Sequence, residues 1–236
     1  MDIALLLLAG SVFAGALIQG TLGVGFALVV VPVMAWLAPD LLPVAVLLLM
    51  LPINALVIAR EHRHIHWGGI FWVSAGRFIG TFSGLWLLAN ASARNLDLLV
   101  GITLIATTIL SLLAPPVASG RKTLTGAGLV TGITETATGI GGPPLALAYQ
   151  HAVPQVMRPT IAVCMAIGQI FSLLMLSLGG LVSGTTLMGT VTLLPATALG
   201  LWLSRWTGPR LKGPALRYAL LAFAFFSGVI LLLGAG

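Results

Sequence analysis

Charged side chains are scarce in this chain of 236 residues. They make up 7% of the composition, and hydrophobic residues make up 58%. A soluble domain has roughly a quarter of its residues charged, and the mean hydropathy here is +1.11. These values exclude an ordinary soluble domain and predict a protein embedded in the lipid bilayer.

Cysteine is almost absent too, because Cys164 stands alone inside an apolar run. It can form neither an internal disulfide nor a Cys-based metal or redox pair. His62, His64 and His66 alternate in a basic segment, a spacing that does not fit one helix face, and no carboxylate or Cys cluster supports them. We therefore expect no metal and no cofactor. No basic residue precedes Arg60, so no cleaved signal peptide is indicated.

The apolar runs also lack the groups that catalysis needs. Hydrolysis inside a membrane requires a Ser–His or paired Asp site. Every His lies near a loop, and Glu135 is the single acid deep in a run, so we expect no enzymatic activity. No nucleotide-binding loop is present. The net charge of +6 comes from basic residues between apolar runs, which indicates membrane topology rather than nucleic-acid binding.

What the chain has in place of these features is an internal repeat with an offset of 116 residues. Gly23-Val24-Gly25 returns as Gly139-Ile140-Gly141, and Gly84-Leu85-Trp86-Leu87 returns as Gly200-Leu201-Trp202-Leu203. Duplicated membrane units with Gly-broken segments at matching positions are typical of secondary transporters. We predict a first repeat over 1–114, a second over 122–236 and a short linker over 115–121.

Two of the apolar runs are interrupted by glycine clusters. A spanning helix needs about 20 residues, and most of the eight runs have this length. The first and fifth contain Gly20 to Gly25 and Gly139 to Gly142, where glycine unwinds a helix at little cost. The eight runs cover 3–36, 41–59, 67–90, 96–114, 124–149, 157–179, 185–204 and 215–235.

The basic residues decide how these two runs cross the membrane. If both are single spans, four basic residues lie on one side and six on the other. If both are hairpins, nine lie on one side and only Arg94 on the other, as the positive-inside rule demands. We therefore predict hairpins in a bacterial inner membrane, with both termini outside. The nine cytoplasmic residues would be Arg60, Arg63, Arg121, Lys122, Arg158, Arg205, Arg210, Lys212 and Arg217.

The predicted fold is an all-α integral membrane protein of two inverted repeats, each one hairpin plus three transmembrane helices. Three spans are an odd number, so the second repeat would be upside down relative to the first. We expect the two hairpin tips to approach each other at the bilayer midplane. Each tip would start a half-helix whose free N–H groups attract anions.

The candidate substrate-binding residues lie at these tips. Glycine could instead serve close helix packing, but that would not explain Gly-x-Gly at matching places in inverted copies. Glu135 and its repeat counterpart Gln19 both stand four residues before the Gly-x-Gly. The tip candidates are Gln19, Thr21, Gly23, Gly25, Glu135, Thr138, Gly139, Gly141 and Gly142.

Arg77 is the one basic residue inside a run, and its repeat counterpart is Leu193. A buried Arg is costly, so it must face protein, water or an anion. It could bind the substrate, or it could form a structural ion pair with Glu135, which itself could carry a proton. Asn54 and Gln169 could line the pathway or bond neighbouring helices. A stripe of Gly76, Gly80 and Gly84, matched by Thr192, Ala196 and Gly200, predicts close-packed helix faces.

The duplicated unit with a Gly-x-Gly segment running into Pro in each half resembles the TauE/SafE family of sulfite exporters. The segments are Gly20 to Gly25 running to Pro32, and Gly139 to Pro144. The likeness covers essentially the whole chain, although Phe26 stands where the family often has a third Gly. It implies a small sulfur-containing anion such as sulfite or a sulfonate.

The predicted function is therefore a secondary carrier or uniporter for a small anion, with alternating access around the hairpin tips. An anion channel of the same fold is the alternative, and an assembly partner without transport is a further one. Substrate identity, transport direction, proton coupling and homo-oligomerisation are open at this point.

Overall fold

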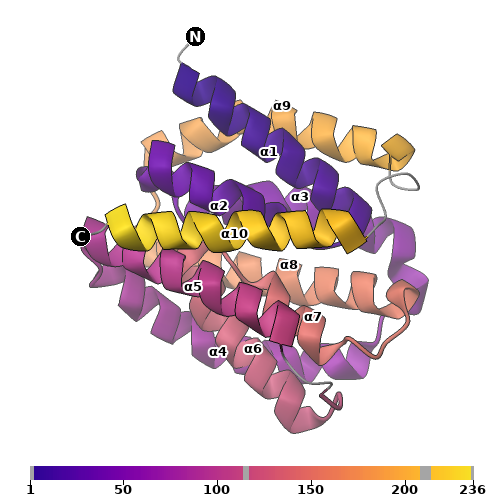
Figure 1. The fold of residues 1–236 in the computed structure, drawn as a ribbon. Helices are drawn as coiled ribbons and strands as arrows, with labels where there is room; N and C mark the ends of the chain where they lie inside the picture. The colour runs from indigo at the N-terminus through magenta and orange to yellow at the C-terminus, as the bar shows by residue number, and fades with distance from the viewer. Residues whose placement is uncertain (1–2, 114–116, 208–213, 235–236) are drawn as a thin grey trace.

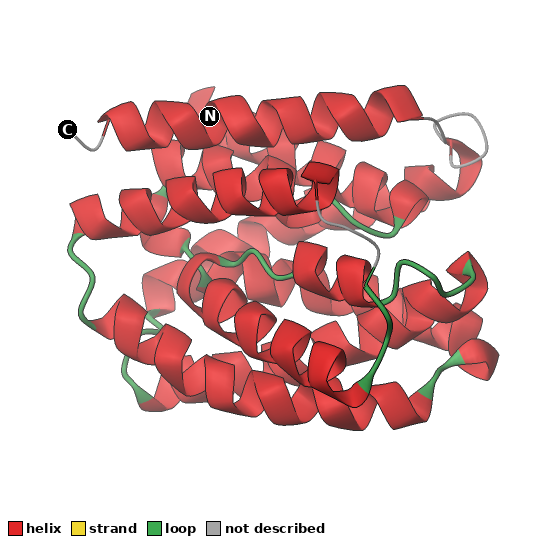
Figure 2. Ribbon diagram, turned by 60° about the horizontal axis from the view of Figure 1, so that its bottom comes forward, coloured by secondary structure: helices red, strands yellow, loops and turns green. Residues whose placement is uncertain are grey.

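The computed structural model describes residues 3–113, 117–207 and 214–234, and within these ranges it consists of helices joined by short loops, without strands (Figure 2). Figure 1 shows the helices lying side by side as a bundle. The α-helices are α1 (Ile3–Leu22), α2 (Phe26–Leu37), α3 (Val44–Glu61), α4 (Trp67–Ala89), α5 (Ala93–Leu113), α6 (Arg121–Thr138), α7 (Gly142–Ala148), α8 (Pro154–Leu178), α9 (Gly184–Thr207) and α10 (Pro214–Gly234). Two 3-10 turns are η1 (Pro39–Leu41) and η2 (His62–His64).

Both expected glycine breaks are present. Gly23 and Gly25 have φ of 82° and 122° between α1 and α2, and Gly139 has φ of 84° between α6 and α7. Only glycine adopts these angles readily, so the chain turns back at these positions. The arms are unequal, because α1 and α6 have 20 and 18 residues whereas α2 and α7 have 12 and 7.

Six helices in the described part of the chain are long and apolar enough to cross a membrane. They cover Ile3–Leu22, Val44–His64, Arg94–Leu113, Pro154–Leu178, Gly184–Trp206 and Ala215–Gly234. These six confirm a multi-pass membrane protein. The first of them is an arm of the first hairpin, which is therefore long enough to span by itself. Helix α4, which carries Arg77, is not among the six.

Helices pack in pairs that join the two halves of the sequence. Helix α4 packs along α6, α1 along α9, α3 along α8 and α5 along α10. Close backbone contacts of glycine recur at the 116-residue offset, because Gly84 and Gly200 correspond and so do their neighbours Ile133 and Leu17. A Cβ added to Gly84 would lie 2.6 Å from the carbonyl oxygen of Ile133, and one added to Gly200 would lie 3.1 Å from the backbone nitrogen of Leu17.

The glycine stripe on α4 lies directly against the α6 backbone. Gly76, Gly80 and Gly84 face backbone atoms of Thr125, Leu129 and Ile133, respectively, so the prediction of a close-packed face is confirmed. On α9 the expected stripe is only partly correct, because Thr192 is exposed, Ala196 is half-buried and Gly200 is buried. The buried face of α9 instead includes Thr190, Leu193, Thr197, Gly200 and Ser204. These buried residues are three or four positions apart, the spacing of one helix face, and Pro195 within α9 does not interrupt it.

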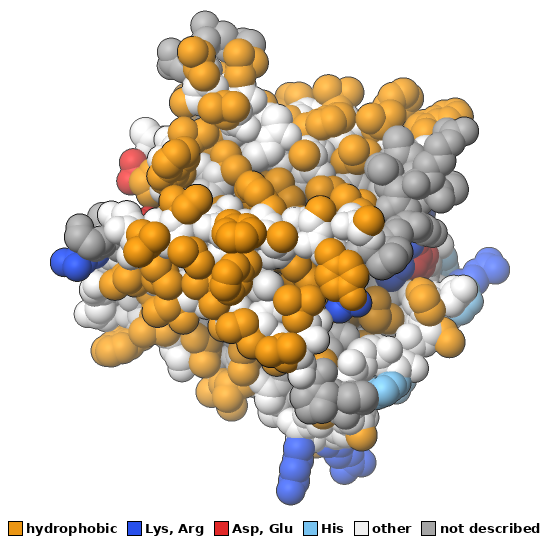
Figure 3. Space-filling view, in the orientation of Figure 1, with side chains coloured by type: hydrophobic (Ala, Val, Ile, Leu, Met, Phe, Trp, Pro, Cys, Tyr) orange, Lys and Arg blue, Asp and Glu red, His pale blue; other side chains and the backbone are white. Residues whose placement is uncertain are grey.

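Basic residues gather at one end of the bundle, here called the basic end. Arg158 lies beside Glu61, and Arg217 donates to the carbonyl of Ser111, so the ends of α3 and α5 meet the starts of α8 and α10 there. Figure 3 shows blue side chains at the right and lower edges and hydrophobic side chains across the middle. Arg94 starts α5 at the opposite end. Helix α1 begins and α10 ends toward that opposite end (Figure 1). Arg210, Lys212 and residues 115–116 of the expected linker lie outside the described residues.

Candidate functional site

A buried ion pair lies at the middle of the bundle. Arg77, halfway along α4, donates to a carboxylate oxygen of Glu135 in the last turn of α6. The exposed fractions of Arg77 and Glu135 are 1% and 0%. Burying two charges is costly unless they are paired and hydrogen-bonded, so their pairing makes this position possible. The sequence left this pairing open as one of two readings.

Two amides extend this pair into α3 and α8. Gln169 Nε2 donates to the second carboxylate oxygen of Glu135 at 2.9 Å. Asn54 Nδ2 donates to Gln169 Oε1 at 3.0 Å. Asn54 and Gln169 are 2% and 0% exposed. The four side chains, here called the charged cluster, come from four helices and form one hydrogen-bonded chain.

The charged cluster has donors that are poorly satisfied. Arg77 Nε is buried and has no hydrogen-bond partner, and Arg77 Nη1 meets only the thioether sulfur of Met165 at 3.3 Å. Gln169 Nε2 also faces the sulfur of Met50 at 3.7 Å. A thioether is a weak acceptor. A buried guanidinium with a free donor would therefore be stabilised by a better acceptor, such as an oxygen of an anion.

Gly168 on α8 makes space for the guanidinium. A Cβ added at this position would overlap Nε, Cζ and Nη2 of Arg77. The guanidinium plane thus lies directly on the α8 backbone. Cys164, one turn earlier on α8, is fully buried and within electrostatic reach of Arg77.

Three hydroxyl groups lie one helical turn from the charged cluster, away from the basic end. Thr136 and Ser172 are 2.8 Å apart, and Thr81 lies 3.5 Å from each of them. All three are fully buried. Beyond them, Val44, Leu47 and Leu176 form a small apolar cluster separate from the main core. The helices α4, α6 and α8 therefore carry a polar layer closed by apolar side chains.

The first hairpin tip satisfies its own polar groups. Gln19 donates to the carbonyl of Gly23 at 3.1 Å and accepts from the N–H of Phe26 at 3.0 Å, so it caps the start of α2. Thr21 bonds its own helix at the carbonyl of Leu17. Gly25 contacts Leu220 rather than a polar side chain. The N-terminus of α2 is thus partly occupied by the protein itself.

Arg158 is a residue that the sequence counted only for topology. It donates to the carbonyl of Gly20 at 3.4 Å, lies against Gly23 and pairs with Glu61 at 3.8 Å. Its Nε is buried without a partner. Its place beside the first tip could not be found from spacing, because it comes from the other repeat.

The second tip lies against the charged cluster. Thr131 donates to the carbonyl of Gly141 at 3.1 Å, and Gly141 packs on the side chain of Glu135. Thr138 bonds the carbonyl of Thr134 within its own helix, and the N–H of Ile140 donates to its hydroxyl at 3.4 Å. Gly142 begins α7, a helix of only 7 residues.

The two tips do not meet at the midplane, contrary to the expectation from the sequence. Gly23 lies beside Arg158, at the Glu61 end of α3, whereas Gly139 lies beside Val46 in the first turn of α3. Fifteen residues of α3 separate Val46 from Glu61, which is about 22 Å at 1.5 Å per residue. The first tip lies near the basic end, and the second lies against the charged cluster on the side away from the basic end. The middle of the bundle holds the charged cluster instead.

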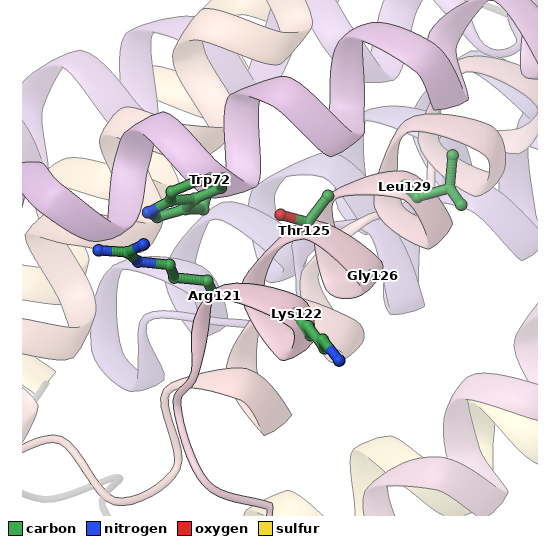
Figure 4. Close-up of a pocket in the computed structure, with 6 residues that line it drawn as sticks. All are labelled: Trp72, Arg121, Lys122, Thr125, Gly126 and Leu129. Atoms are coloured by element: carbon green, nitrogen blue, oxygen red, sulfur yellow. The ribbon is translucent and has the colours of Figure 1, made fainter.

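A shallow groove on the outer surface is separate from this cluster. Figure 4 shows it between α4 and α6 near the basic end, with Arg121 stacked on Trp72 at 5.3 Å from the ring centre. Its other lining residues are Lys122, Thr125, Gly126 and Leu129. In the described parts of the chain, no group of three or more His, Cys, Asp or Glu side chains could hold a metal.

The spanning helices and the buried charged cluster define a multi-pass helical membrane protein with a polar centre. The family model described as "Sulfite exporter TauE/SafE" matches residues 7–231. The chain therefore belongs to the TauE/SafE family, a family of membrane transporters for sulfite and related anions. No curated protein and no solved structure matches it.

Proposed function

We propose that this protein is a secondary carrier for a small sulfur-containing anion, such as sulfite or a sulfonate, and that the anion binds at the charged cluster. The observation that carries the proposal is Arg77. Its Nε has no partner and its Nη1 faces only a thioether, although the whole side chain is buried. An oxygen of an oxyanion would be a stronger acceptor for either donor than a thioether is, because a hydrogen bond between a guanidinium and an anion is charge-assisted.

The repeat supports a functional rather than a structural role for the charges. At the 116-residue offset, Arg77 and Glu135 correspond to Leu193 and Gln19. Leu193 and Gln19 are also buried, and their helices α9 and α1 pack together as α4 and α6 do. The α4–α6 pair therefore packs with a buried ion pair, and the α1–α9 pair packs without one.

The closed surroundings of the cluster support a carrier over a channel. Its four side chains are at most 2% exposed, with apolar residues between them and each end of the bundle. An open pore would leave them hydrated. Alternating access then requires one group of helices to move against another.

Helix packing suggests which group moves. Helices α4 and α6 touch through backbone atoms at Gly80, Gly84 and Gly132, so they form one rigid pair. Their contacts with α8 at the cluster are made by side chains, including Glu135–Gln169 and Thr136–Ser172. We place the movement between the α4–α6 pair and α3–α8, with the substrate at that interface.

The test is a binding and uptake assay on purified protein. Ligand screening by thermal shift uses sulfite, thiosulfate, sulfonates and short carboxylates, since a bound ligand raises the apparent melting temperature. Uptake into proteoliposomes should saturate and show counter-transport. Flux that does not saturate would favour the channel instead.

Two variants of Arg77 separate binding from folding. Arg77→Lys keeps the charge but loses the planar fork, so anion affinity should fall while the protein still folds. The double variant Arg77→Leu with Glu135→Gln copies the uncharged residues Leu193 and Gln19 of the α1–α9 pair. Replacing a buried ion pair with neutral groups is often neutral for stability or stabilising by about 1–4 kcal/mol. It should therefore fold and bind no anion, and unchanged anion affinity in this variant would refute the proposed site.

A further inference from the structure

We infer that each anion is carried together with one proton, and that Glu135 holds this proton while the anion occupies Arg77. This rests on the proposed function, because it assigns a second transported species to the same site. The inference follows from the geometry of Arg77, whose guanidinium would bind the Glu135 carboxylate and the anion side by side.

The carboxylate and the anion would lie on neighbouring nitrogens of Arg77. Glu135 occupies Nη2, and the adjoining Nη1, which meets only the thioether of Met165, is left for the anion. The guanidinium also lies flat on Gly168 and cannot retreat toward α8. An anion bound there would be a close neighbour of the Glu135 carboxylate. Like charges at such distances in a buried site disfavour double ionisation.

Among the described residues, the elements around Glu135 supply no second positive charge. Helix α4 contributes Arg77, α8 contributes the Gln169 amide and the Cys164 thiol, and the turn before α7 contributes the backbone of Gly141. Helix α3 reaches Glu135 only through the amide of Asn54 on Gln169. Arg77 and Glu135 together are neutral, so a bound monoanion leaves one excess negative charge. One proton on Glu135 restores neutrality.

A neutral side chain of this length fits the hairpin. Gln19, which corresponds to Glu135 at the 116-residue offset, caps the first hairpin through its amide. Thr136 follows Glu135 on α6, and its hydroxyl joins those of Ser172 on α8 and Thr81 on α4 in a layer on the side of the charged cluster away from the basic end. Hydroxyl groups both donate and accept, so this layer offers the proton a route.

The experiment uses wild-type protein in proteoliposomes with methanesulfonate, a monoanion that does not titrate between pH 5 and 8. An inward anion gradient should acidify the lumen, with one proton entering for each anion. Because the pair carries no net charge, an imposed potassium-diffusion potential should not change the rate of uptake. This measurement needs no variant and therefore does not depend on the folding of a mutant.

In the variant Glu135→Gln, the number of protons that enter for each methanesulfonate taken up should fall at least tenfold below the wild-type ratio. Glu61→Gln, which removes the acid beside Arg158, is the matched control and should behave like the wild type. Uptake that follows the imposed potential without proton entry would overturn the coupling and leave the carrier proposal intact. If the wild type neither exchanges nor takes up methanesulfonate or sulfite, the proposed function fails, and the coupling fails with it.

Discussion

At the scale of single residues, the most constrained position is Gly168. Its missing side chain gives the Arg77 guanidinium a flat surface, and no other residue type could leave that space. Glu135 accepts from the guanidinium, Gln169 donates to Glu135, and Asn54 donates to Gln169. The site is thus defined as much by the absence of one side chain as by the presence of four.

We predict that Gly168→Ala weakens anion binding by roughly tenfold, about 1.4 kcal/mol. The added methyl group would overlap Arg77 and move its donors. Overpacking of this kind costs about 1–3 kcal/mol of stability, part of which the better helix propensity of Ala, about 1 kcal/mol, offsets. A thermal-shift titration with the anion measures both effects.

Gly10→Ala is the control for this substitution. Gly10 also lies inside a helix, but a Cβ there would meet no atom within 4 Å. It should bind the anion as the wild type does. Equal affinity in the Gly168 and Gly10 variants would contradict the proposed place of the anion on Arg77.

The sequence predicted which residues lie at the centre of the bundle better than it predicted their hydrogen-bond partners. Arg77 and Glu135 stood out because ionisable groups are rare in apolar runs. The Asn54–Gln169 bond joins residues 115 positions apart, and the Met165 sulfur meets an arginine from another helix. Such contacts depend on how the helices pack, which apolar periodicity alone does not specify. Arg158 was missed for the same reason.

At the scale of elements, the backbone contact between α4 and α6 sets the geometry of the ion pair. A Cβ added to Gly132 would lie 2.7 Å from the carbonyl oxygen of Arg77 and 3.0 Å from the nitrogen of Thr81. Backbone atoms cannot turn aside as a flexible side chain can. The two helices would have to separate.

We therefore predict that Gly132→Ala destabilises the protein by about 1–3 kcal/mol, the usual cost of overpacking, and reduces uptake as well. Gly126→Ala on the same helix is its control, because a Cβ there meets nothing within 4 Å. That control should be as stable as the wild type or slightly more so. Melting temperatures in detergent compare the three proteins. A Gly132 variant that melts with the control would show that α4 and α6 can separate freely.

The elements themselves followed from the sequence to a large extent. The glycine clusters predicted both helix breaks, because positive φ angles at Gly23, Gly25 and Gly139 suit no other residue. The lengths of the arms did not follow. The break falls off-centre in each hairpin, because α1 and α6 are longer than α2 and α7, and the two tips lie apart. A pattern of apolar residues does not specify these arm lengths.

At the scale of the whole molecule, the basic end predicts the orientation in the membrane. Seven of the nine basic residues expected in the cytoplasm belong to described residues, and α1 begins and α10 ends away from the basic end. By the positive-inside rule the basic end faces the cytoplasm. Both ends of the chain are then expected outside.

A reporter that works only in the cytoplasm tests this orientation. Fused after Gly236, it should give no signal, and fused to a chain truncated after Ser119, it should give a strong one. The second fusion is the control for expression and for the reporter itself. A strong signal from the fusion at Gly236 would reject the hairpin topology.

The uncharged counterpart of the ion pair has a further consequence for binding stoichiometry. The fold offers the same helix packing twice, at α4–α6 and at α1–α9, but Gln19 and Leu193 stand where the charges would be. A titration of the purified protein should therefore reveal one class of sites and one anion per chain. The charged α4–α6 pair would thus bind the anion, and the uncharged α1–α9 pair would contribute packing alone.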